Sequence, residues 1–135
     1  MTETRAWRIA FVALAIFVTW QTLTPDPDDT KGEMAFARWI AELLFHSADM
    51  GDKVAHFLAY AALGGSAAFG RFGLLGRRGP IIAAIAVYGM ALEGLQGLGG
   101  VREPEIADAI ANALGVILSF GGAALLERSL APRAA

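Results

Sequence analysis

Apolar residues along the chain gather in four stretches that are separated by polar or basic connections. A helix needs ~20 mostly apolar residues to cross a bilayer, and ~17 is the lower limit. We therefore predict an all-α fold, a single membrane domain over residues 1–135 with four transmembrane helices. The four stretches cover residues 8–23, 54–69, 81–98 and 106–126.

A further helix is predicted at residues 34–45, inside the long acidic connection after the first stretch. Arg38 and Glu42 face away from its apolar side. That side is formed by Phe36, Trp39, Ile40, Leu43 and Leu44. The helix is too short to cross a bilayer, and its amphipathic pattern indicates a helix that lies in the membrane interface.

Composition supports a membrane protein, because 56% of the residues are hydrophobic and only 18% are charged. A soluble domain of 135 residues would need more polar surface than this. The net charge of −2 argues against nucleic-acid binding. The absence of cysteine excludes disulfides, iron–sulfur clusters and thiol nucleophiles.

Arginines predict the orientation of the chain. Arg5 and Arg8 precede an apolar run at residues 9–20 as in a signal peptide, but no small-x-small cleavage pattern follows, so a retained signal anchor is expected. Further arginines lie in the connection 70–80 and in the C-terminal tail. The positive-inside rule places both termini and this connection in the cytoplasm, and the connections 24–53 and 99–105 outside.

Polar residues inside the predicted crossings recur at helical spacing. An ionisable group at the bilayer centre costs at least ~2.5–3.5 kcal/mol, so it normally faces the bundle interior and has a partner. Asp52 is expected to cap the second crossing. The spaced groups are Asp52, His56 and Tyr60 on the second crossing, Glu93 and Gln96 on the third, and Asp108 and Asn112 on the fourth. The predicted directions bring all of them except Tyr60 to the outer ends, at a depth similar to that of Arg102.

Taken singly, these side chains have ordinary structural roles. Gln96 and Asn112 suit hydrogen bonds between helices, Asp52 a cap and Tyr60 packing. Together, one histidine, three carboxylates and one arginine exceed what cohesion of four helices needs, so we predict a functional cluster. Its candidate ligand-binding residues are Asp52, Lys53, His56, Tyr60, Glu93, Gln96, Arg102, Asp108 and Asn112, with His56, Glu93 and Asp108 as catalytic candidates.

The order and spacing of these residues resemble the VanZ-like family, small bacterial membrane proteins named for a teicoplanin-resistance accessory protein. The matching elements are Asp52-Lys53-x-x-His56-Phe57-x-x-Tyr60, Glu93-x-x-Gln96, Arg102 and Asp108-x-x-x-Asn112-x-x-Gly115. The resemblance covers about residues 50–120, and it implies a four- or five-helix fold in the bacterial inner membrane, in a cell-envelope setting. The resemblance does not imply a particular reaction. Teicoplanin resistance is a property of the protein after which the family is named, and it is not expected of this chain on that ground.

Two functions fit the predicted cluster. In the first, an outward-facing pocket binds a lipid headgroup, a cell-wall precursor or a lipidated glycopeptide antibiotic, with Lys53 and Arg102 engaging an anionic group. In the second, His56 and a carboxylate act as acid and base on a lipid or a cell-wall precursor. His56, Glu93 and Asp108 could together ligate a metal ion, but one histidine and two carboxylates are weak support for a metal site. We therefore expect neither a metal nor a cofactor.

Transport is a third possibility, and it needs polar residues through the full thickness of the membrane. The inner halves of the second, third and fourth crossings offer only Ser66, Tyr88 and Ser119. A pore within one copy of the chain is therefore not predicted.

Overall fold

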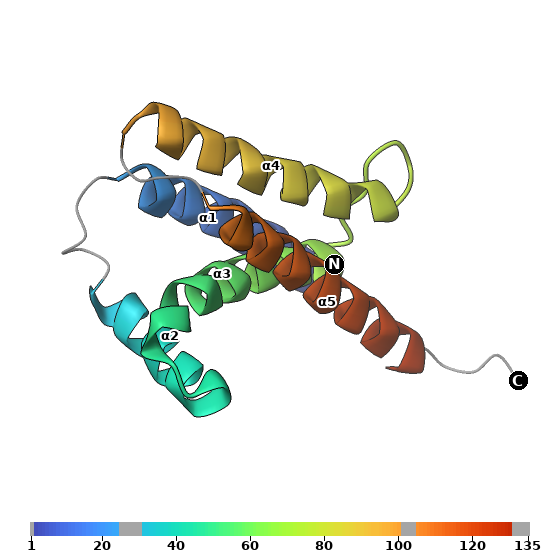
Figure 1. Ribbon diagram of the computed structural model, residues 1–135. Coiled ribbons are helices and arrows are strands. Elements are labelled where there is room, and N and C mark those ends of the chain that lie inside the picture. The colour runs from blue at the N-terminus through green and yellow to red at the C-terminus, as the bar shows by residue number, and fades with distance from the viewer. Residues whose placement is uncertain (1, 25–30, 101–104, 131–135) are drawn as a thin grey trace, which may run out of the picture.

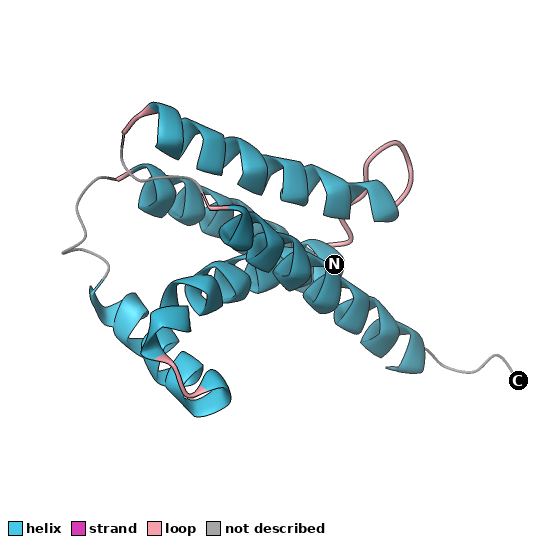
Figure 2. Cartoon of the chain, viewed as in Figure 1, coloured by secondary structure: helices cyan, strands magenta, loops and turns pink. Residues whose placement is uncertain are grey.

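The described chain is entirely helical apart from short connections. The computed structural model describes residues 2–24, 31–100 and 105–130. Figure 1 shows the elements in order, and Figure 2 shows turns and loops where the connections between them are described. The elements are α1 (Thr2–Leu23), α2 (Lys31–Phe45), the 3₁₀ turn η1 (Ala48–Met50), α3 (Gly51–Phe69), α4 (Gly79–Leu98) and α5 (Ile106–Leu130). The predicted all-α class is confirmed.

Three of the described helices, α1, α4 and α5, are long and apolar enough to cross a membrane. The helix α3 is not among them, because Asp52, Lys53 and His56 lie in its first two turns and lower its apolar content. The structure therefore supports three of the four predicted crossings by length and composition.

The helices α3 and α5 form the centre of the bundle and run in the same direction (Figure 1). Glycine lets their backbones approach closely, as small residues do between membrane helices. A Cβ atom on Gly115 would collide with the carbonyl oxygen of Phe57 and lie 2.9 Å from the backbone nitrogen of Ala61. A Cβ atom on Gly64 would lie 2.8 Å from the carbonyl oxygen of Val116.

The helix α1 packs beside α3 and α4 through a few polar contacts and an apolar core. The hydroxyls of Thr19 and Tyr88 are 2.6 Å apart, and the Tyr88 hydroxyl donates to the carbonyl oxygen of Ala15. At the other end of α1, Arg8 Nε donates to the carbonyl oxygen of Gly70 over 2.9 Å. The start of α1 thus lies beside the end of α3, so these two helices are antiparallel.

The short helix α2 packs on the start of α3 through small residues. Ala37 and Ala41 are buried with Val54 of α3. The bulky apolar side chains on the rest of α2 are exposed over 56–63% of their surface: Phe36, Trp39, Leu43, Leu44 and Phe45. An apolar face that points away from the protein is the face that an interfacial helix presents to lipid.

Helix starts differ from the predicted ones. The helix α1 begins at Thr2 rather than at residue 8, so its arginines belong to the helix. The predicted N-cap of the second crossing is wrong: α3 begins at Gly51, its N-cap is Met50 and no side chain caps it. Asp52 lies in the first turn instead, where a carboxylate still interacts favourably with the positive end of the helix dipole.

Candidate functional site

Seven polar residues meet where α3 and α5 begin and α4 nears its end. We call them the polar cluster: Asp52, Lys53, His56, Glu93, Glu105, Asp108 and Asn112. Spacings of three or four put residues of one helix on one face. Because α3 and α5 are parallel and α4 runs antiparallel to them, those three faces converge at one end of the bundle.

Lys53 joins α3 to α5 through carboxylates. Its Nζ atom lies 3.1 Å from Asp108 Oδ1 and 3.4 Å from Asp52 Oδ2, and it donates a short hydrogen bond to Glu105 Oε2. Lys53 precedes the apolar part of α3. Burial there acts to lower the pKa of Lys53, but hydrogen bonds to Glu105 and Asp108 outweigh it and raise the pKa above its usual value. Lys53 therefore carries a positive charge at neutral pH.

Glu105 is the member of the polar cluster that the sequence reasoning missed. The available signal was its spacing, since Glu105 lies three residues before Asp108 at the start of α5. Its pairing with Lys53 also changes the expected role of that lysine. Lys53 was predicted to engage an anionic ligand, whereas here its ammonium group already contacts three carboxylates.

His56 lies between α4 and α5. Its Nδ1 atom is 3.1 Å from Asn112 Oδ1 and 3.5 Å from Glu93 Oε1, while Nε2 is 3.8 Å from Asp108 Oδ2. With the proton on Nδ1, the ring donates to Asn112, and Nε2 keeps a lone pair on the side of Asp108. Asn112 and Glu93 on the Nδ1 side and Asp108 on the Nε2 side therefore fix the orientation of the imidazole.

The floor of the polar cluster is deeply buried and its rim is partly open. Asp108 and Asn112 are each only 1% exposed, whereas the side chains of Lys53 and His56 keep 21% and 17% of their surface. Within the described part of the chain, Asn112 Nδ2 is buried and has no hydrogen-bond partner. A buried donor that lacks a partner costs about 1–3 kcal/mol, so this atom marks a place that suits a ligand acceptor.

A divalent cation could use part of the same group. Ligand atoms of Asp52, His56 and Asp108 all lie within 4.8 Å of one another. A mixed nitrogen and oxygen donor set suits Zn²⁺. The set differs from the predicted one, because Asp52 takes the place of Glu93, which faces the other ring nitrogen of His56. The Lys53 ammonium lies between the carboxylates of Asp52 and Asp108, so a metal ion would have to displace it.

Two of the predicted site residues lie outside the polar cluster, and the structure does not describe a third. Tyr60 is buried in the apolar core, with its ring against Gly89 of α4. Gln96 is buried on α4, three residues beyond Glu93. Arg102 lies outside the described residues, so the predicted contact of its guanidinium with a ligand stays a prediction.

Comparison with protein-family models, with curated proteins and with solved structures found no match to this chain. The resemblance to the VanZ-like family therefore rests on the spaced residues alone. The geometry of the polar cluster is independent of that resemblance.

Proposed function

We propose that the chain is a four-crossing, VanZ-like protein of the bacterial inner membrane whose polar cluster binds the polar headgroup of an envelope molecule. The single observation that carries this proposal is a buried set of ionisable side chains, drawn from three helices, with a partly open rim. Such groups are costly in a membrane, and functional sites are where proteins retain them.

Contacts at the two ends of the bundle support α3 as the fourth crossing. At one end His56 of α3 approaches Asp108 of α5. At the other end Arg78 donates both to the carbonyl oxygen of Ala68 on α3 and to Glu127 on α5 over 2.7 Å. At a rise of ~1.5 Å per residue, Asp108 and Glu127 are about 28 Å apart along α5, close to the ~30 Å hydrocarbon thickness. Between the same contacts α3 covers only about 18 Å, from His56 to Ala68, but its full 19 residues extend about 28 Å and so approach the same thickness.

The distribution of arginines supports an outward-facing cluster. Arg8, Arg71 and Arg78 lie at the end of the bundle opposite the polar cluster, where α1 begins and α3 ends. The positive-inside rule puts that end in the cytoplasm. The polar cluster then opens at the outer interface, where headgroups and cell-wall precursors are found.

The rim of the polar cluster offers donors and acceptors to a headgroup. Its partly exposed members present an ammonium, an imidazole and two carboxylates: Lys53, His56, Asp52 and Glu105. Because Lys53 is already paired, we expect a ligand to bind through both an acceptor and a donor rather than through a single anionic group. Lipid headgroups, cell-wall precursors and lipidated glycopeptides all carry both kinds of group.

Lipid retention tests the proposal. The full chain is purified in mild detergent, exposed to a total bacterial lipid extract and analysed by native mass spectrometry. We expect at least one lipid-like molecule to remain bound to the wild type and to be lost from His56→Ala and Asn112→Ala. The matched control is Ser66→Ala, which removes a buried hydroxyl of α3 that bonds only within its own helix.

Two outcomes would contradict the binding proposal. One is a wild-type protein that retains no extract component above the level of the His56→Ala variant. The other is an equal loss of bound molecules in Ser66→Ala, because that variant leaves the polar cluster intact. The polar cluster would then only hold the helices together.

The orientation of His56 favours acid–base catalysis as a second candidate function. Its Nε2 atom has Asp108 at 3.8 Å, and Nδ1 is held by Asn112 and Glu93. Such a base assists hydrolysis or group transfer on a lipid or a cell-wall precursor. Product formation from the lipid extract in proteoliposomes, absent in His56→Gln, would favour the enzyme. Binding without any product would favour the binding protein.

A further inference from the structure

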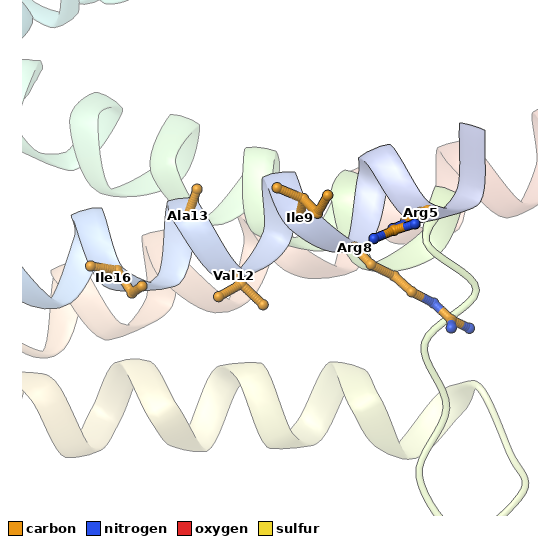
Figure 3. Close-up of a pocket in the computed structure, with 6 residues that line it drawn as sticks. All are labelled: Arg5, Arg8, Ile9, Val12, Ala13 and Ile16. Carbon is orange, nitrogen blue, oxygen red and sulfur yellow. The ribbon is translucent and has the colours of Figure 1, made fainter. Parts of the chain in front are cut away.

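A groove runs along the face of α1 that is turned away from the other helices. Its volume is about 410 Å³. Figure 3 shows two arginines at one end and an apolar row that extends along the helix. The lining residues recur every three or four positions and so form one stripe of the helix: Arg5, Arg8, Ile9, Val12, Ala13 and Ile16.

This stripe does not contribute to the protein core. Phe11, Leu14, Ala15 and Val18 on the opposite side of α1 pack against α3 and α4. Ile9, Val12 and Ile16 keep 53–66% of their surface exposed. The small side chain of Ala13 leaves the space between these three larger residues. The groove therefore presents a continuous apolar surface to whatever surrounds the bundle.

The two arginines form a basic end to this apolar surface. Arg8 is held in place, because its Nε donates to the carbonyl oxygen of Gly70 and its guanidinium carbon lies 5.7 Å from the centre of the Phe72 ring. The bond uses one of five guanidinium N–H groups, which leaves the terminal nitrogens for another acceptor. Arg5 is exposed one turn away on the same face. A guanidinium group can bind a phosphate in a bidentate manner, so each of these arginines suits a phosphate at this end of the apolar row.

The length of the stripe matches half of a bilayer. At ~1.5 Å per residue, Arg5 and Ile16 are about 16 Å apart along the axis, and one leaflet of hydrocarbon is about 15 Å thick. A phosphate at the arginines would therefore place an acyl chain along Ile9, Val12, Ala13 and Ile16 up to the bilayer midplane.

We propose that this groove is a binding site for one anionic phospholipid, with its phosphate on Arg5 and Arg8 and an acyl chain along the apolar row. The charge of the arginines selects an anionic headgroup, and the length of the apolar row matches a molecule that stands in a leaflet. The site lies at the opposite end of the bundle from the polar cluster and does not depend on the function proposed above.

Competition between two phospholipids tests this proposal. The full chain in mild detergent receives equal amounts of phosphatidylglycerol and phosphatidylcholine with the same acyl chains, and bound lipid is counted by native mass spectrometry. We expect the wild type to retain phosphatidylglycerol preferentially. Because a basic residue near an anionic surface is worth about fivefold in affinity, Arg5→Gln should reduce that preference by about this factor.

Two further variants separate the groove from general electrostatic attraction. Ala13→Leu fills the space between Ile9 and Ile16 without changing charge, and it should weaken retention of phosphatidylglycerol as strongly as Arg5→Gln does. Arg77→Gln removes an exposed arginine at the same end of the bundle but outside the groove, and it should leave retention unchanged.

Three results would overturn the proposal. Equal retention of both lipids by the wild type would show that the groove selects no charge. An equal loss in Arg77→Gln would show that any arginine at this end suffices. Dimers that persist in the wild type and vanish in Ala13→Leu, without a change in lipid binding, would assign the groove to a second copy of the chain.

Discussion

Lys53 determines the electrostatics of the polar cluster at the scale of single residues. Its ammonium group touches Asp52, Glu105 and Asp108, and Asp108 is 1% exposed. Lys53→Met removes the positive charge and leaves these carboxylates facing one another. Breaking a fully buried pair costs about 3–5 kcal/mol; because Lys53 is partly exposed, we expect a loss of about 2–3 kcal/mol in the free energy of unfolding.

Denaturant titration in detergent micelles, followed by circular dichroism, measures this loss for Lys53→Met. Arg77→Met is the matched control, since it removes an exposed charge in the connection between α3 and α4. If both variants unfold at the same denaturant concentration as the wild type, Lys53 does not stabilise the start of α5, and the electrostatic account of the polar cluster is wrong.

Spacing within helices was enough to predict most of the polar cluster. Asp52 and His56 lie four residues apart, as do Asp108 and Asn112, and the structure places both pairs at one end of the bundle. Spacing cannot tell which residue of a stripe lies deeper in the bundle. Tyr60 continues the stripe of His56, yet one turn further along the helix it meets Gly89 and the apolar core.

The crossing of α3 and α5 holds the polar cluster together at the scale of helices. Gly115 lies against the backbone of Phe57 and Ala61, which cannot move aside as a flexible side chain would. Gly115→Ala should therefore push the helices apart. Overpacking of a core typically costs 1–3 kcal/mol, and a backbone collision belongs near the upper end, so we expect a loss of about 3 kcal/mol in the free energy of unfolding.

Gly122→Ala on the same helix is the control for this change. A Cβ atom on Gly122 meets nothing within 4 Å, and alanine is a better helix former than glycine. Its melting temperature should stay unchanged or rise slightly, whereas that of Gly115→Ala should fall. Equal melting temperatures for the two variants would mean that α3 and α5 are not closely packed at Gly115.

The helix α2 should contact lipid through its exposed apolar face. Trp39 projects from that face and stacks on Phe36, with ring centres 6.1 Å apart. With Trp7 and Trp20 replaced by phenylalanine, the fluorescence of Trp39 in vesicles should be quenched by lipids brominated near the headgroup end of the acyl chain. Quenching by aqueous iodide with no effect of brominated lipid would place α2 in water and reject an interfacial helix.

The apolar pattern predicted the existence of every helix better than it predicted their ends. An apolar window begins where the residues become apolar, so residue 8 was the expected start of α1, whereas hydrogen bonding continues the helix back to Thr2. The prediction that Asp52 caps α3 was wrong for a related reason. The turn η1 at Ala48–Met50 leads directly into Gly51, and a side-chain preference for capping did not determine where α3 begins.

At the scale of the whole molecule, the chain divides into a basic end and an acidic end. Arg8, Arg71 and Arg78 lie around the end of α3, and Asp52 and Asp108 lie around its start. The sequence predicted this division from the loops alone, because the arginines of the loops report orientation. The loop arginines do not indicate how the helices pack against one another. They therefore could not predict that α3 and α5 would be the closest pair.

The proposed fourth crossing by α3 has a direct consequence for labelling. The chain has no cysteine, so single cysteines can be introduced without interference. Asp49 precedes α3, Arg77 follows it, and both side chains are exposed. A membrane-impermeant maleimide added to intact cells should label Asp49→Cys, but it should label Arg77→Cys only after the membrane is opened.

Ser129→Cys, exposed near the end of α5, should behave as Arg77→Cys does, because α3 and α5 are parallel. If Asp49→Cys and Arg77→Cys react from the same side, α3 does not cross the membrane, and the polar cluster loses its outer interface.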